Sequence, residues 1–588
     1  MPQTLDDFSV GDLILRHARA FPDKAALIVV ANAADDAWTS VSYRELAVRA
    51  ARRAHWLMAG ANGLNRGDRV VLALPTGLEF AEAYVACLIG GLVAVPVPTP
   101  ESSREAAHRF AGVVRDAEAG AVLAMERDVE ELRNALAPEA RALVRLVEPL
   151  PDDGIEPFAT AAAGDLAVLQ YTSGSIGDPK GVMISNANMK SNAGALAEAL
   201  GLGPDDRIGG WVPMHHDMGL FAMLSTSLVL GMTCVLMPPM AFLKRPKDWL
   251  RVIDRHEITI TAAPNFAYDM CLRTVSDADL DGLDLSRLRF AINGAEPIVE
   301  KVLREFTERF ARAGLAPGVV TPGYGLAEAT VFVSANSSDT LPRVFHADLD
   351  RLAHGELKAG GEAAWPLVGC GFPNDFDLRI VHPELCHEVP PGTIGEIWLR
   401  GPSVGLGYWR DPGATERTFR GTTRGDTGWL RTGDLGAVVD GELYVTGRRK
   451  EILIIRGRNL YPQDLEVEAR ASHSALHGLV GAAFSVPGET HEIPVIVHEV
   501  HPRTAAHELP AIVTAIQERL SARLGLAVDN VVLVRRGSVR RTTSGKIQRL
   551  AMRDRFLRGD LTWRHALLDA GTRRRADARR EQAVGAGR

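Results

Sequence analysis

An apolar segment at residues 166–171 runs directly into a loop of small, hydroxyl-bearing residues that ends in a lysine. Glycine lets a backbone approach anionic oxygen atoms closely, and successive N–H groups can then form one anion-binding nest. The loop's candidate phosphate contacts are Thr172, Ser173, Gly174, Ser175, Gly177 and Lys180. Because open α/β sheets bind ligands beyond the carboxyl ends of their strands, this strand and loop predict such a sheet with a polyphosphate ligand.

Two other interpretations of the loop are weaker. A Walker P-loop ends in Gly-Lys-Ser/Thr, whereas here Pro179 precedes the lysine and Gly181 follows it. A surface turn is the usual structure of an isolated Gly/Ser-rich segment. The apolar strand that leads into this loop disfavours that interpretation.

Apolar strand patterns alternate with helical patterns along most of the chain. Ser42 and Glu45 form a capping box before a helix, and another helix begins near Glu79. Further strand candidates are residues 69–74, 92–97, 233–237, 258–262, 288–292 and 318–321. This alternation predicts an α/β fold of helix-covered, mostly parallel sheets.

The character of the chain changes after about residue 395. Short β-rich segments appear at 395–400 and 443–446, and a charged break follows at 447–451. The remaining residues suit a smaller α+β domain of usual size. We therefore predict an N-terminal domain at 1–449 and a C-terminal domain at 450–588, whose basic tail at 573–588 is expected to be disordered.

The composition of the chain limits the classes of protein to which it can belong. A chain of 588 residues exceeds one hydrophobic core, so more than one domain is expected. The formal net charge of −7 argues against general nucleic-acid binding, which needs a basic face. Five widely spaced cysteines contain no CxxC pair, so neither a disulfide framework nor a zinc site is expected, and a cytoplasmic location fits.

No targeting or membrane segment is predicted. The N-terminus is acidic where a signal peptide would be apolar. The longest apolar run, 83–97, is interrupted by Gly90, Gly91 and Pro96. It is better explained by a buried helix and the next strand than by a membrane span.

Histidines offer two superficial metal motifs. His215, His216 and Asp217 are adjacent, but neighbours in an extended segment point to opposite faces, and no further ligands are evident. The pair His491 and His498 is too widely spaced for a helical zinc motif. A metal site is not predicted from either group.

Four further polar turns follow the loop in a fixed order, at residues 293–297, 324–330, 429–434 and 544–549. Each alone would more often be structural. Together with the loop they resemble the adenylate-forming superfamily, over about residues 10 to 560. The resemblance implies a large N-terminal domain with a small β-barrel-like part, and a small mobile C-terminal domain.

The resemblance assigns most roles to nucleotide binding. Tyr324 would offer its ring to adenine, Asp434 would accept from the ribose hydroxyls, and Glu328 would hold Mg²⁺ beside the phosphates. The other implied nucleotide contacts are Gly294, Ala295, Glu296, Gly325 and Arg448. A core tyrosine, a turn aspartate and a surface glutamate are the structural alternatives.

Lys546 resembles the lysine of the mobile domain. A carboxylate and the α-phosphate are both anionic, so their reaction needs a cation where negative charge gathers. Lys450 lies at the family's hinge, and rotation there would carry Lys546 in and out. The implied catalytic set is Lys546, Glu328, Lys180 and His216. A solvated loop lysine is the alternative for Lys546.

Within the superfamily the chain most resembles the fatty acyl-AMP ligases. The segments 211–220, 263–268 and 457–466 carry this resemblance, and the stretch from Glu328 to Gly369 is longer than in most acyl-CoA synthetases. Such an insertion is associated with failure to use free coenzyme A. The implied acyl pocket consists of His216, Asp217, Met218, Gly219, Asn265, Phe266 and Tyr268.

Three positions depart from the family pattern. Ile176 replaces a threonine in the loop, Asn186 stands where histidine is common, and Arg540 replaces a proline. Loss of one charge-assisted hydrogen bond at Ile176 is worth roughly 1.5–3 kcal/mol. Weakened adenylation, roughly ten- to a hundredfold, is the largest expected consequence.

These observations favour an enzyme that uses ATP and Mg²⁺ to convert a fatty acid to acyl-AMP and pyrophosphate. The acyl group would then pass to the phosphopantetheine thiol of a separate acyl carrier protein. An acyl-CoA synthetase is the first alternative, and a degenerate, non-catalytic adenylate-binding protein is the second. Acyl chain length and carrier identity are not encoded in the motifs.

Overall fold

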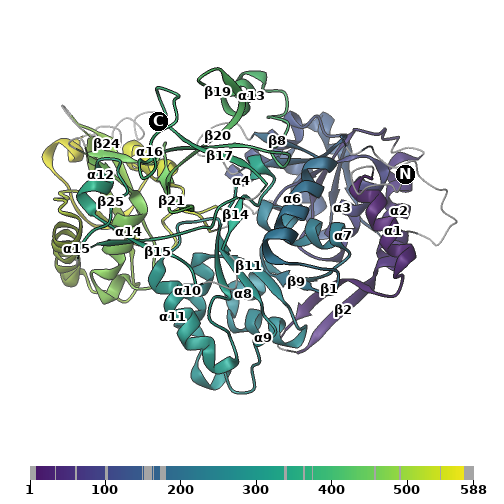
Figure 1. Cartoon of the computed structure of the whole chain (residues 1–588), viewed down its shortest axis with the longest axis horizontal. Helices are drawn as coiled ribbons and strands as arrows, with labels where there is room; N and C mark the ends of the chain where they lie inside the picture. The colour runs from purple at the N-terminus through teal and green to yellow at the C-terminus, as the bar shows by residue number, and fades with distance from the viewer. Residues whose placement is uncertain are drawn as a thin grey trace.

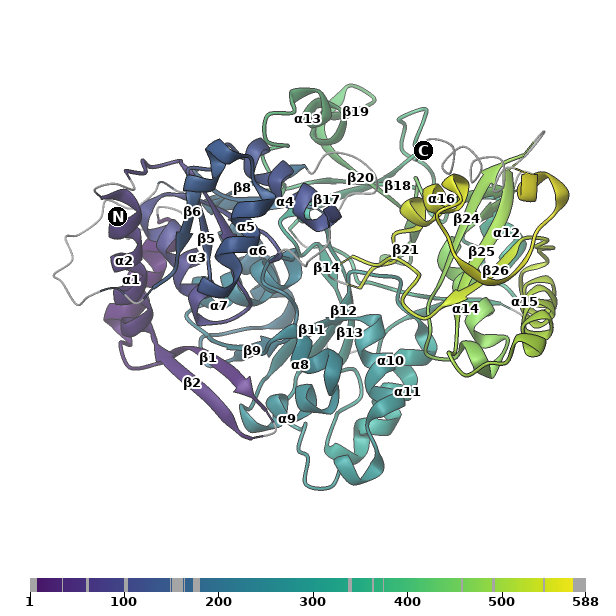
Figure 2. The ribbon, with the colours of Figure 1, turned by 180° about the vertical axis from the view of Figure 1, so that it is seen from behind.

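The computed structural model describes residues 8–33, 35–59, 63–99, 104–148, 150, 162, 164–172, 180–336, 341–361, 364–373, 375–455, 458–488, 492–542 and 545–574. Helices α1 and α2 lie at one end of the molecule, and the C-terminal elements form a distinct lobe at the other (Figures 1 and 2). The α/β architecture predicted from the alternating patterns is confirmed.

The first sheet ends at the predicted phosphate loop. Its strand order is β6-β5-β3-β4-β7-β8, and all neighbours are parallel except β7 and β8. The strands are β3 (Arg69–Ala73), β4 (Val93–Pro96), β5 (Ala121–Ala124), β6 (Val144–Leu146), β7 (Leu166–Tyr171) and β8 (Gly181–Ser185). Strand β7 has the predicted bounds, and its end is joined to β8 by the loop.

A second sheet has eight strands in the order β14-β13-β12-β11-β9-β10-β1-β2, with antiparallel strands only at its two edges. The strands are β1 (Ala25–Asn32), β2 (Ala37–Ser42), β9 (Arg207–Gly210), β10 (Thr233–Leu236), β11 (Ile260–Pro264), β12 (Phe290–Gly294), β13 (Val320–Tyr324) and β14 (Ser334–Ala335). Strands β11, β12 and β13 each begin two residues later than predicted and end in glycine, proline or tyrosine. Apolar periodicity alone does not mark such ends.

Helices cover these two sheets. They are α1 (Val10–Ala20), α2 (Tyr43–Met58), α3 (Leu78–Gly90), α4 (Arg104–Asp116), α5 (Glu126–Ala135), α6 (Asn186–Leu200), α7 (Thr226–Leu230), α8 (Pro239–Lys244), α9 (Lys247–Arg255), α10 (Asn265–Thr274) and α11 (Glu300–Phe310). The capping box at Ser42 and Glu45 is present at the start of α2. The apolar run at 83–97 forms the end of α3 and β4, as predicted.

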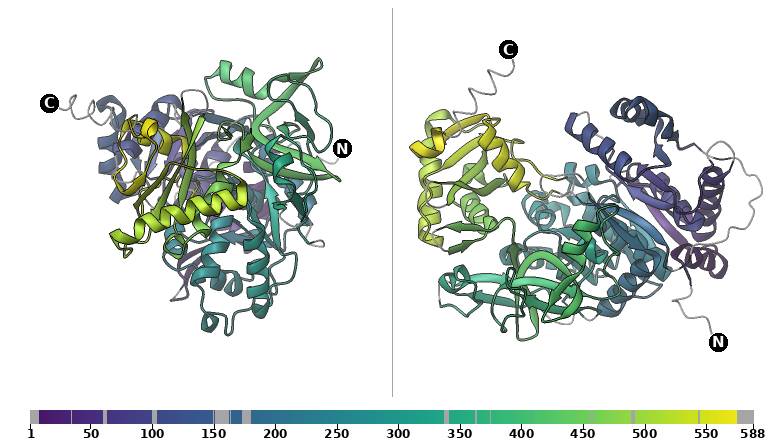
Figure 3. Two further views of the ribbon diagram at one scale, coloured as in Figure 1. Left: turned by 90° about the vertical axis from the view of Figure 1, so that its left-hand side faces the viewer. Right: turned by 90° about the horizontal axis from the view of Figure 1, so that it is seen from above.

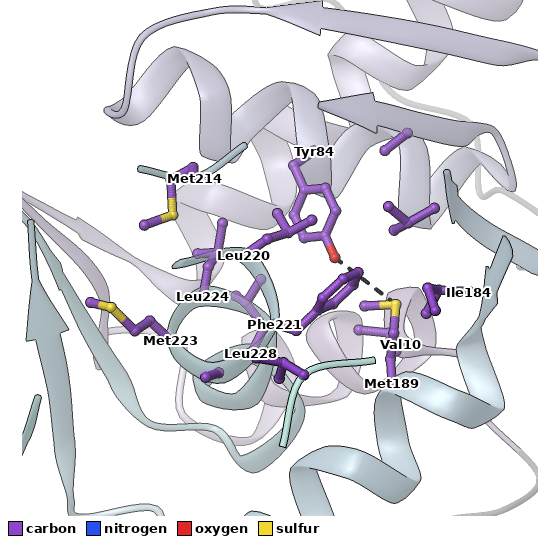
Figure 4. Packing of buried hydrophobic residues seen from close by; sticks show 14 of the residues in the cluster. Val10, Tyr84, Ile184, Met189, Met214, Leu220, Phe221, Met223, Leu224 and Leu228 are labelled. Atoms are coloured by element: carbon purple, nitrogen blue, oxygen red, sulfur yellow. Dashed lines mark hydrogen bonds between the residues drawn. The ribbon is translucent and has the colours of Figure 1, made fainter. Parts of the chain in front are cut away.

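One large apolar core joins both sheets. Tyr84 of α3 lies fully buried in it, beside Phe221 and Leu220 of a π-helical turn, Met218–Ser225 (Figure 4). Its hydroxyl pairs with the Ser225 hydroxyl at 2.8 Å and contacts the Met189 sulfur at 3.9 Å. A buried hydroxyl needs such partners, so this core fixes the π-helical turn as well as the sheets.

An antiparallel sheet follows, where the β-barrel-like part was expected. It orders β17 (Asp377–Val381), β18 (Gly395–Arg400), β20 (Asp426–Val439) and β19 (Gly421–Thr423), with β21 (Glu442–Arg448) also paired to β20. Helices α12 (Leu349–Ala353) and α13 (Pro412–Phe419) and the hairpin of β15 (Val344–Ala347) and β16 (Trp365–Val368) flank it. Strand β18 has the predicted bounds.

The C-terminal lobe is an α+β sandwich (Figure 3). After the hairpin of β22 (Leu453–Ile455) and β23 (Arg458–Leu460), its sheet orders β24 (Gly481–Pro487), β25 (Glu492–Val500), β26 (Val531–Arg535) and β27 (Trp563–Leu567). Side chains alternate between its faces. Helices α14 (Pro462–Ala471) and α15 (Leu509–Leu524) share one apolar cluster with the sheet, and α16 (Arg549–Arg558) shares the other.

The apolar core of the C-terminal lobe extends into the preceding part of the chain. The first cluster of the lobe also contains Trp365, Ala437 and Tyr444, so apolar packing crosses the predicted boundary at Lys450, which stays a prediction. At the start of the predicted tail, the Arg573 N–H donates to the Asp569 carbonyl at 2.9 Å in a helical turn, and the disorder of the tail stays a prediction. Residues 575–588 lie outside the described part. Among the described helices, none is long and apolar enough to cross a membrane.

Candidate active site

Several predicted site residues lie at the ends of three neighbouring strands. Pro264 and Gly294 are register partners at the ends of β11 and β12, and β13 ends beside them at Tyr324. Asn265 follows the first of these ends, and its Oδ1 accepts from Asn293 Nδ2 at 3.1 Å and from Val299 N at 3.2 Å. The predicted turns therefore lie side by side at one edge of the sheet.

Glycine is required where these turns meet. A Cβ at Gly294 would lie 2.9 Å from the Gly323 carbonyl oxygen, and one at Gly325 would lie 1.7 Å from the Val331 carbonyl oxygen. Ala295, the residue after β12, has a φ of 67°, a backbone conformation that is energetically unfavourable for alanine. The backbone is thus packed tightly around the predicted adenine position.

Tyr324 and Asp434 form a buried pair, and the more exposed Arg448 joins it from the neighbouring strand. The Tyr324 hydroxyl donates to Asp434 Oδ2 at 2.8 Å, and Arg448 Nε lies 2.9 Å from Asp434 Oδ1. Asp434 and Arg448 face each other across β20 and β21. Asp434 raises the pKa of the Arg448 guanidinium, and burial followed by Asp434 raises the pKa of the Tyr324 phenol. A carboxylate has further lone pairs, so both oxygens can still accept from a ribose.

Glu328 and Lys180 are brought together by a residue that sequence analysis missed. Tyr408 donates its hydroxyl to Glu328 Oε1 at 2.8 Å, and Lys180 Nζ lies 5.0 Å from the centroid of the Tyr408 ring. Lys180 also pairs with Asp411 Oδ2 at 3.4 Å. The position of Tyr408 beside Gly407, and of Asp411 directly before Pro412, could have indicated a structured polar turn.

Only the ends of the phosphate loop are described. The Thr172 N–H donates to the Lys180 carbonyl at 3.3 Å, which closes the loop at its base. Ser173, Gly174, Ser175 and Gly177, together with the departure at Ile176, lie outside the described residues. Their phosphate-binding role stays a prediction.

The His216 segment is a turn, so the expectation of an extended segment was wrong. The His216 N–H donates to the Pro213 carbonyl at 3.1 Å. A Cβ at Gly219 would lie 2.3 Å from the same carbonyl oxygen, so only glycine allows the chain to return this close. His216 Nδ1 lies 2.6 Å from Asp217 Oδ1, which also accepts from Met218 N at 2.7 Å. Burial lowers the pKa of His215 to about 3.

The structure offers no metal cluster here: among the described residues, no group of three histidine, cysteine, aspartate or glutamate side chains could hold an ion. His498, of the second superficial motif, lies buried in β25, and its Nδ1–H donates to the Glu499 carbonyl at 2.6 Å. Its partner His491 lies outside the described residues. A cation that binds together with a nucleotide would need only the Glu328 carboxylate from the protein. The phosphates of the nucleotide would supply the other oxygen ligands.

Two predicted pocket residues have different surroundings. Phe266 is partly buried near Trp211, at a ring-centroid distance of 5.9 Å. Tyr268 is fully buried against Trp249 and Phe306, and its hydroxyl donates to the Ile292 carbonyl at 2.9 Å. Tyr268 therefore packs in the core behind β12, which does not support its expected place in the pocket lining.

Lys546 lies in a short hairpin that reaches this edge of the sheet. The Thr542 N–H donates to the Lys546 carbonyl at 2.8 Å, and Gly545 at the tip has a φ of 89°. A Cβ on Gly545 would lie 2.6 Å from the Phe266 ring, so the tip packs directly on α10. The hairpin of the C-terminal lobe thus brings Lys546 to this edge of the sheet.

The charges around Lys546 come from both halves of the site. Burial lowers the pKa of its ammonium, while the carboxylates of Asp217, Asp434 and Glu296 oppose that shift. Burial raises the pKa of Glu296 to about 7, and its Oε1 accepts from Phe266 N at 2.5 Å. Burial alone would raise the pKa of Asp217, but His216 and Lys546 outweigh it and hold that pKa below its usual range.

The remaining predicted positions have structural contacts. Lys450 lies in the turn between β21 and β22, where the Glu451 N–H donates to the Arg448 carbonyl at 2.9 Å. Asn186 Oδ1 accepts from Val10 N at 3.1 Å, so this departure from the family has a packing role. The Arg540 carbonyl accepts from Gln548 N at 3.0 Å at the base of the lysine hairpin.

Comparison with known proteins agrees with this geometry. The AMP-binding enzyme family matches residues 14–409. A 4-hydroxyphenylalkanoate adenylyltransferase of Mycobacterium tuberculosis is 36% identical, covering 94% of this chain and 92% of the relative. A long-chain-fatty-acid–AMP ligase of Mycobacterium marinum is 38% identical over 83% of this chain and 87% of its own length.

A medium-chain-fatty-acid–acyl-carrier-protein ligase of Moorena producens is 36% identical, covering 89% of this chain and 90% of its own. Among solved structures, one from a study of fatty acyl-adenylate ligases of E. coli and L. pneumophila superposes with a TM-score of 0.83 at 30% identity, covering 95% of this chain and 98% of that one. The predicted adenylate-forming resemblance is confirmed. The chain belongs to the AMP-binding enzyme family.

Proposed function

We propose that this enzyme activates a fatty acid with ATP, forming acyl-AMP and pyrophosphate, and passes the acyl group to the phosphopantetheine thiol of a separate acyl carrier protein. The observation that carries the proposal is the packing of the Lys546 hairpin on Phe266 of α10, within electrostatic range of the carboxylates of Asp217, Asp434 and Glu296. Relatives named as fatty-acid–AMP and acyl-carrier-protein ligases support the choice of acid and acceptor.

Adenylation joins two anions. A carboxylate oxygen attacks the α-phosphorus, a P–O bond forms, and the P–O bond to pyrophosphate breaks. Tyr324 and Asp434 would orient the nucleoside, and Lys180 and the loop after β7 would hold the outgoing phosphates. Lys546 would offset the negative charge that gathers between acid and phosphate, which is worth most in a site shielded from water.

A divalent cation fits the outer phosphates. When bound, Mg²⁺ would neutralise phosphate charge, with Glu328 as its protein ligand. The Tyr408 hydroxyl leaves the second oxygen of Glu328 available for this role. In the second half-reaction the thiolate would attack the acyl carbonyl and AMP would leave with the bonding electrons. Rotation about Lys450 would first withdraw Lys546.

A cytoplasmic location is part of the proposal. All five cysteines are free thiols, and four of them are buried in the structure. Cys87 has its pKa raised to about 12 by burial, which makes it inert. A protein that keeps every cysteine reduced suits a reducing compartment.

The test is ATP–pyrophosphate exchange with a panel of acids, followed by acceptor assays. Saturated fatty acids of increasing length are expected to support exchange, and hydroxyphenylalkanoic acids belong in the panel because of the adenylyltransferase relative. Transfer to a holo acyl carrier protein should greatly exceed transfer to coenzyme A. Efficient acyl-CoA formation would instead indicate an acyl-CoA synthetase.

Failure of every acid to support exchange would favour the non-catalytic alternative. The decisive variant is Ile176→Thr, which restores the hydroxyl that the family carries in the loop. If neither protein exchanges pyrophosphate, the enzyme proposal is rejected. If only the variant does, the fold is competent and the natural chain has lost the activity.

A further inference from the structure

A single arginine joins the lysine hairpin to two other parts of the C-terminal lobe. Arg549 is the first residue of α16 and follows Lys546 by three positions. Its Nε and Nη2 donate to the two carboxylate oxygens of Glu466, each at 2.8 Å. Its Nη1 donates to Glu451 Oε2 at 2.5 Å. The guanidinium is therefore shared between two carboxylates.

All three side chains are shielded from water. Their exposed fractions are 11% for Arg549, 3% for Glu466 and 18% for Glu451. Exposed ion pairs contribute little, whereas charges held out of water depend on the geometry of their partners. Arginine suits this place because its planar fork binds one carboxylate through two parallel bonds and still has a donor for another.

Each carboxylate belongs to a different structural unit. Glu466 lies in α14, and its Oε1 also accepts from Ala483 N of β24 at 3.0 Å, so it is fixed to the sheet of the lobe. Glu451 directly follows Lys450, the predicted hinge. Glu451 also lies within electrostatic range of Arg448, the partner of Asp434. The contacts thus run from the hinge to the helix that begins at the hairpin.

The path from Arg549 to Lys546 is short and stiff. Gln548 donates its N–H to the Arg540 carbonyl at 3.0 Å, and Arg541 and Ile547 form a β-bridge. The hairpin can therefore move little relative to the start of α16. A displacement of the guanidinium would be transmitted to the lysine.

We propose that Arg549 is a positioning residue that makes Lys546 follow the hinge, by bonding the hairpin to Glu451 and to Glu466. The inference rests on the proposed function, because it assigns Lys546 to adenylation. Arg549 contacts no predicted substrate group. Its role is to turn rotation at Lys450 into one defined position of the lysine ammonium, and it acts in the half-reaction that uses that position.

The experiment compares the two half-reactions in three variants of the full-length protein. Arg549→Lys keeps the charge without the fork, Arg549→Gln removes the charge, and Glu451→Gln removes only the link to the hinge. Acyl-AMP formation is followed by pyrophosphate exchange with a saturated fatty acid. Transfer is followed separately, from chemically prepared acyl-AMP to a holo acyl carrier protein.

We expect adenylation kcat to fall roughly tenfold or more in both Arg549 variants and roughly threefold in Glu451→Gln, because small displacements of a catalytic group are costly. KM for ATP and transfer from acyl-AMP should stay within about twofold of wild type. The matched control is Arg558→Gln, at the exposed end of the same helix, where the guanidinium pairs with Asp560 at 2.9 Å. It should change neither half-reaction.

Three results would overturn the inference. Parallel loss of both half-reactions would mean a purely structural role. An unchanged adenylation rate in Arg549→Lys and Arg549→Gln would mean that the bonds are dispensable. If the Arg549 variants do not fold, Glu451→Gln decides alone, and equal effects on both half-reactions there reject the link. A wild-type protein that makes no acyl-AMP would reject the proposed function instead, which is a distinct outcome.

Discussion

The two faces of the candidate site are held by different forces. The nucleotide face is fixed by backbone contact and buried hydrogen bonds, as at Gly325 and between Tyr324 and Asp434. The lysine face, the hairpin that holds Lys546, is fixed by an ionic cluster within its own lobe, and its Gly545 packs on Phe266. If the C-terminal lobe rotates at Lys450 as proposed, the lysine face would move as one unit while the nucleotide face stays with the sheet.

The largest effect is expected on the lysine face, where a substitution should impair one half-reaction and spare the other. Lys546→Ala should lower acyl-AMP formation at least roughly ten- to a hundredfold, because one charge-stabilising donor is lost. Pyrophosphate exchange measures it. Transfer from preformed acyl-AMP should survive, and Lys301→Ala, an exposed helical lysine, is the control. An unchanged exchange rate would mean that another cation performs this role.

A smaller effect is expected on the nucleotide face. Asp434→Asn keeps an acceptor for Tyr324 but removes the negative charge beside Arg448. Loss of a charge-assisted bond should lower kcat/KM for ATP roughly tenfold. Steady-state kinetics with varied ATP measures this. If the loss appears in kcat for transfer and not in the ATP dependence, Asp434 belongs to neither face as described.

Tyr408→Phe tests the phosphate end of the nucleotide face. It removes the bond to Glu328 Oε1 and leaves the ring beside Lys180. Loss of a hydrogen bond of ordinary net strength should raise the KM for Mg·ATP roughly two- to tenfold. Titration of Mg²⁺ at fixed ATP is the measurement. Identical Mg²⁺ dependence in both proteins would remove Tyr408 from the site.

The smallest effect concerns stability within the lysine face. Burial, with Glu466 and Glu468 nearby, raises the pKa of Asp464 to about 8, against a usual value of 3.8. Between these values the folded state holds a proton that the unfolded state has lost, so stability falls as the pH rises through that interval. Asp464→Asn should flatten this fall. Urea unfolding at about pH 5 and about pH 8 tests it, and an equally steep fall in the variant would contradict it.

Local sequence was sufficient for many elements. The strands at 166–171 and 395–400 have their predicted bounds, because each is an apolar run flanked by turn-forming residues. The predicted ends of β11 and β12 fall two residues too early, and that of β13 three residues too early. The last residues of these strands pair through their backbones beside the candidate site. Their side chains do not continue the apolar pattern from which the strands were predicted.

The order of motifs along the sequence determined the family and the identity of most candidate site residues. Only the tertiary structure decided which of them meet. Tyr324 and Asp434 are 110 positions apart and Arg549 and Glu466 are 83 apart, yet each pair shares a hydrogen bond. The reason is physical: motifs record the chemistry that a position must supply, whereas contacts between distant segments depend on how sheets and lobes pack, and packing has no local signature in the chain.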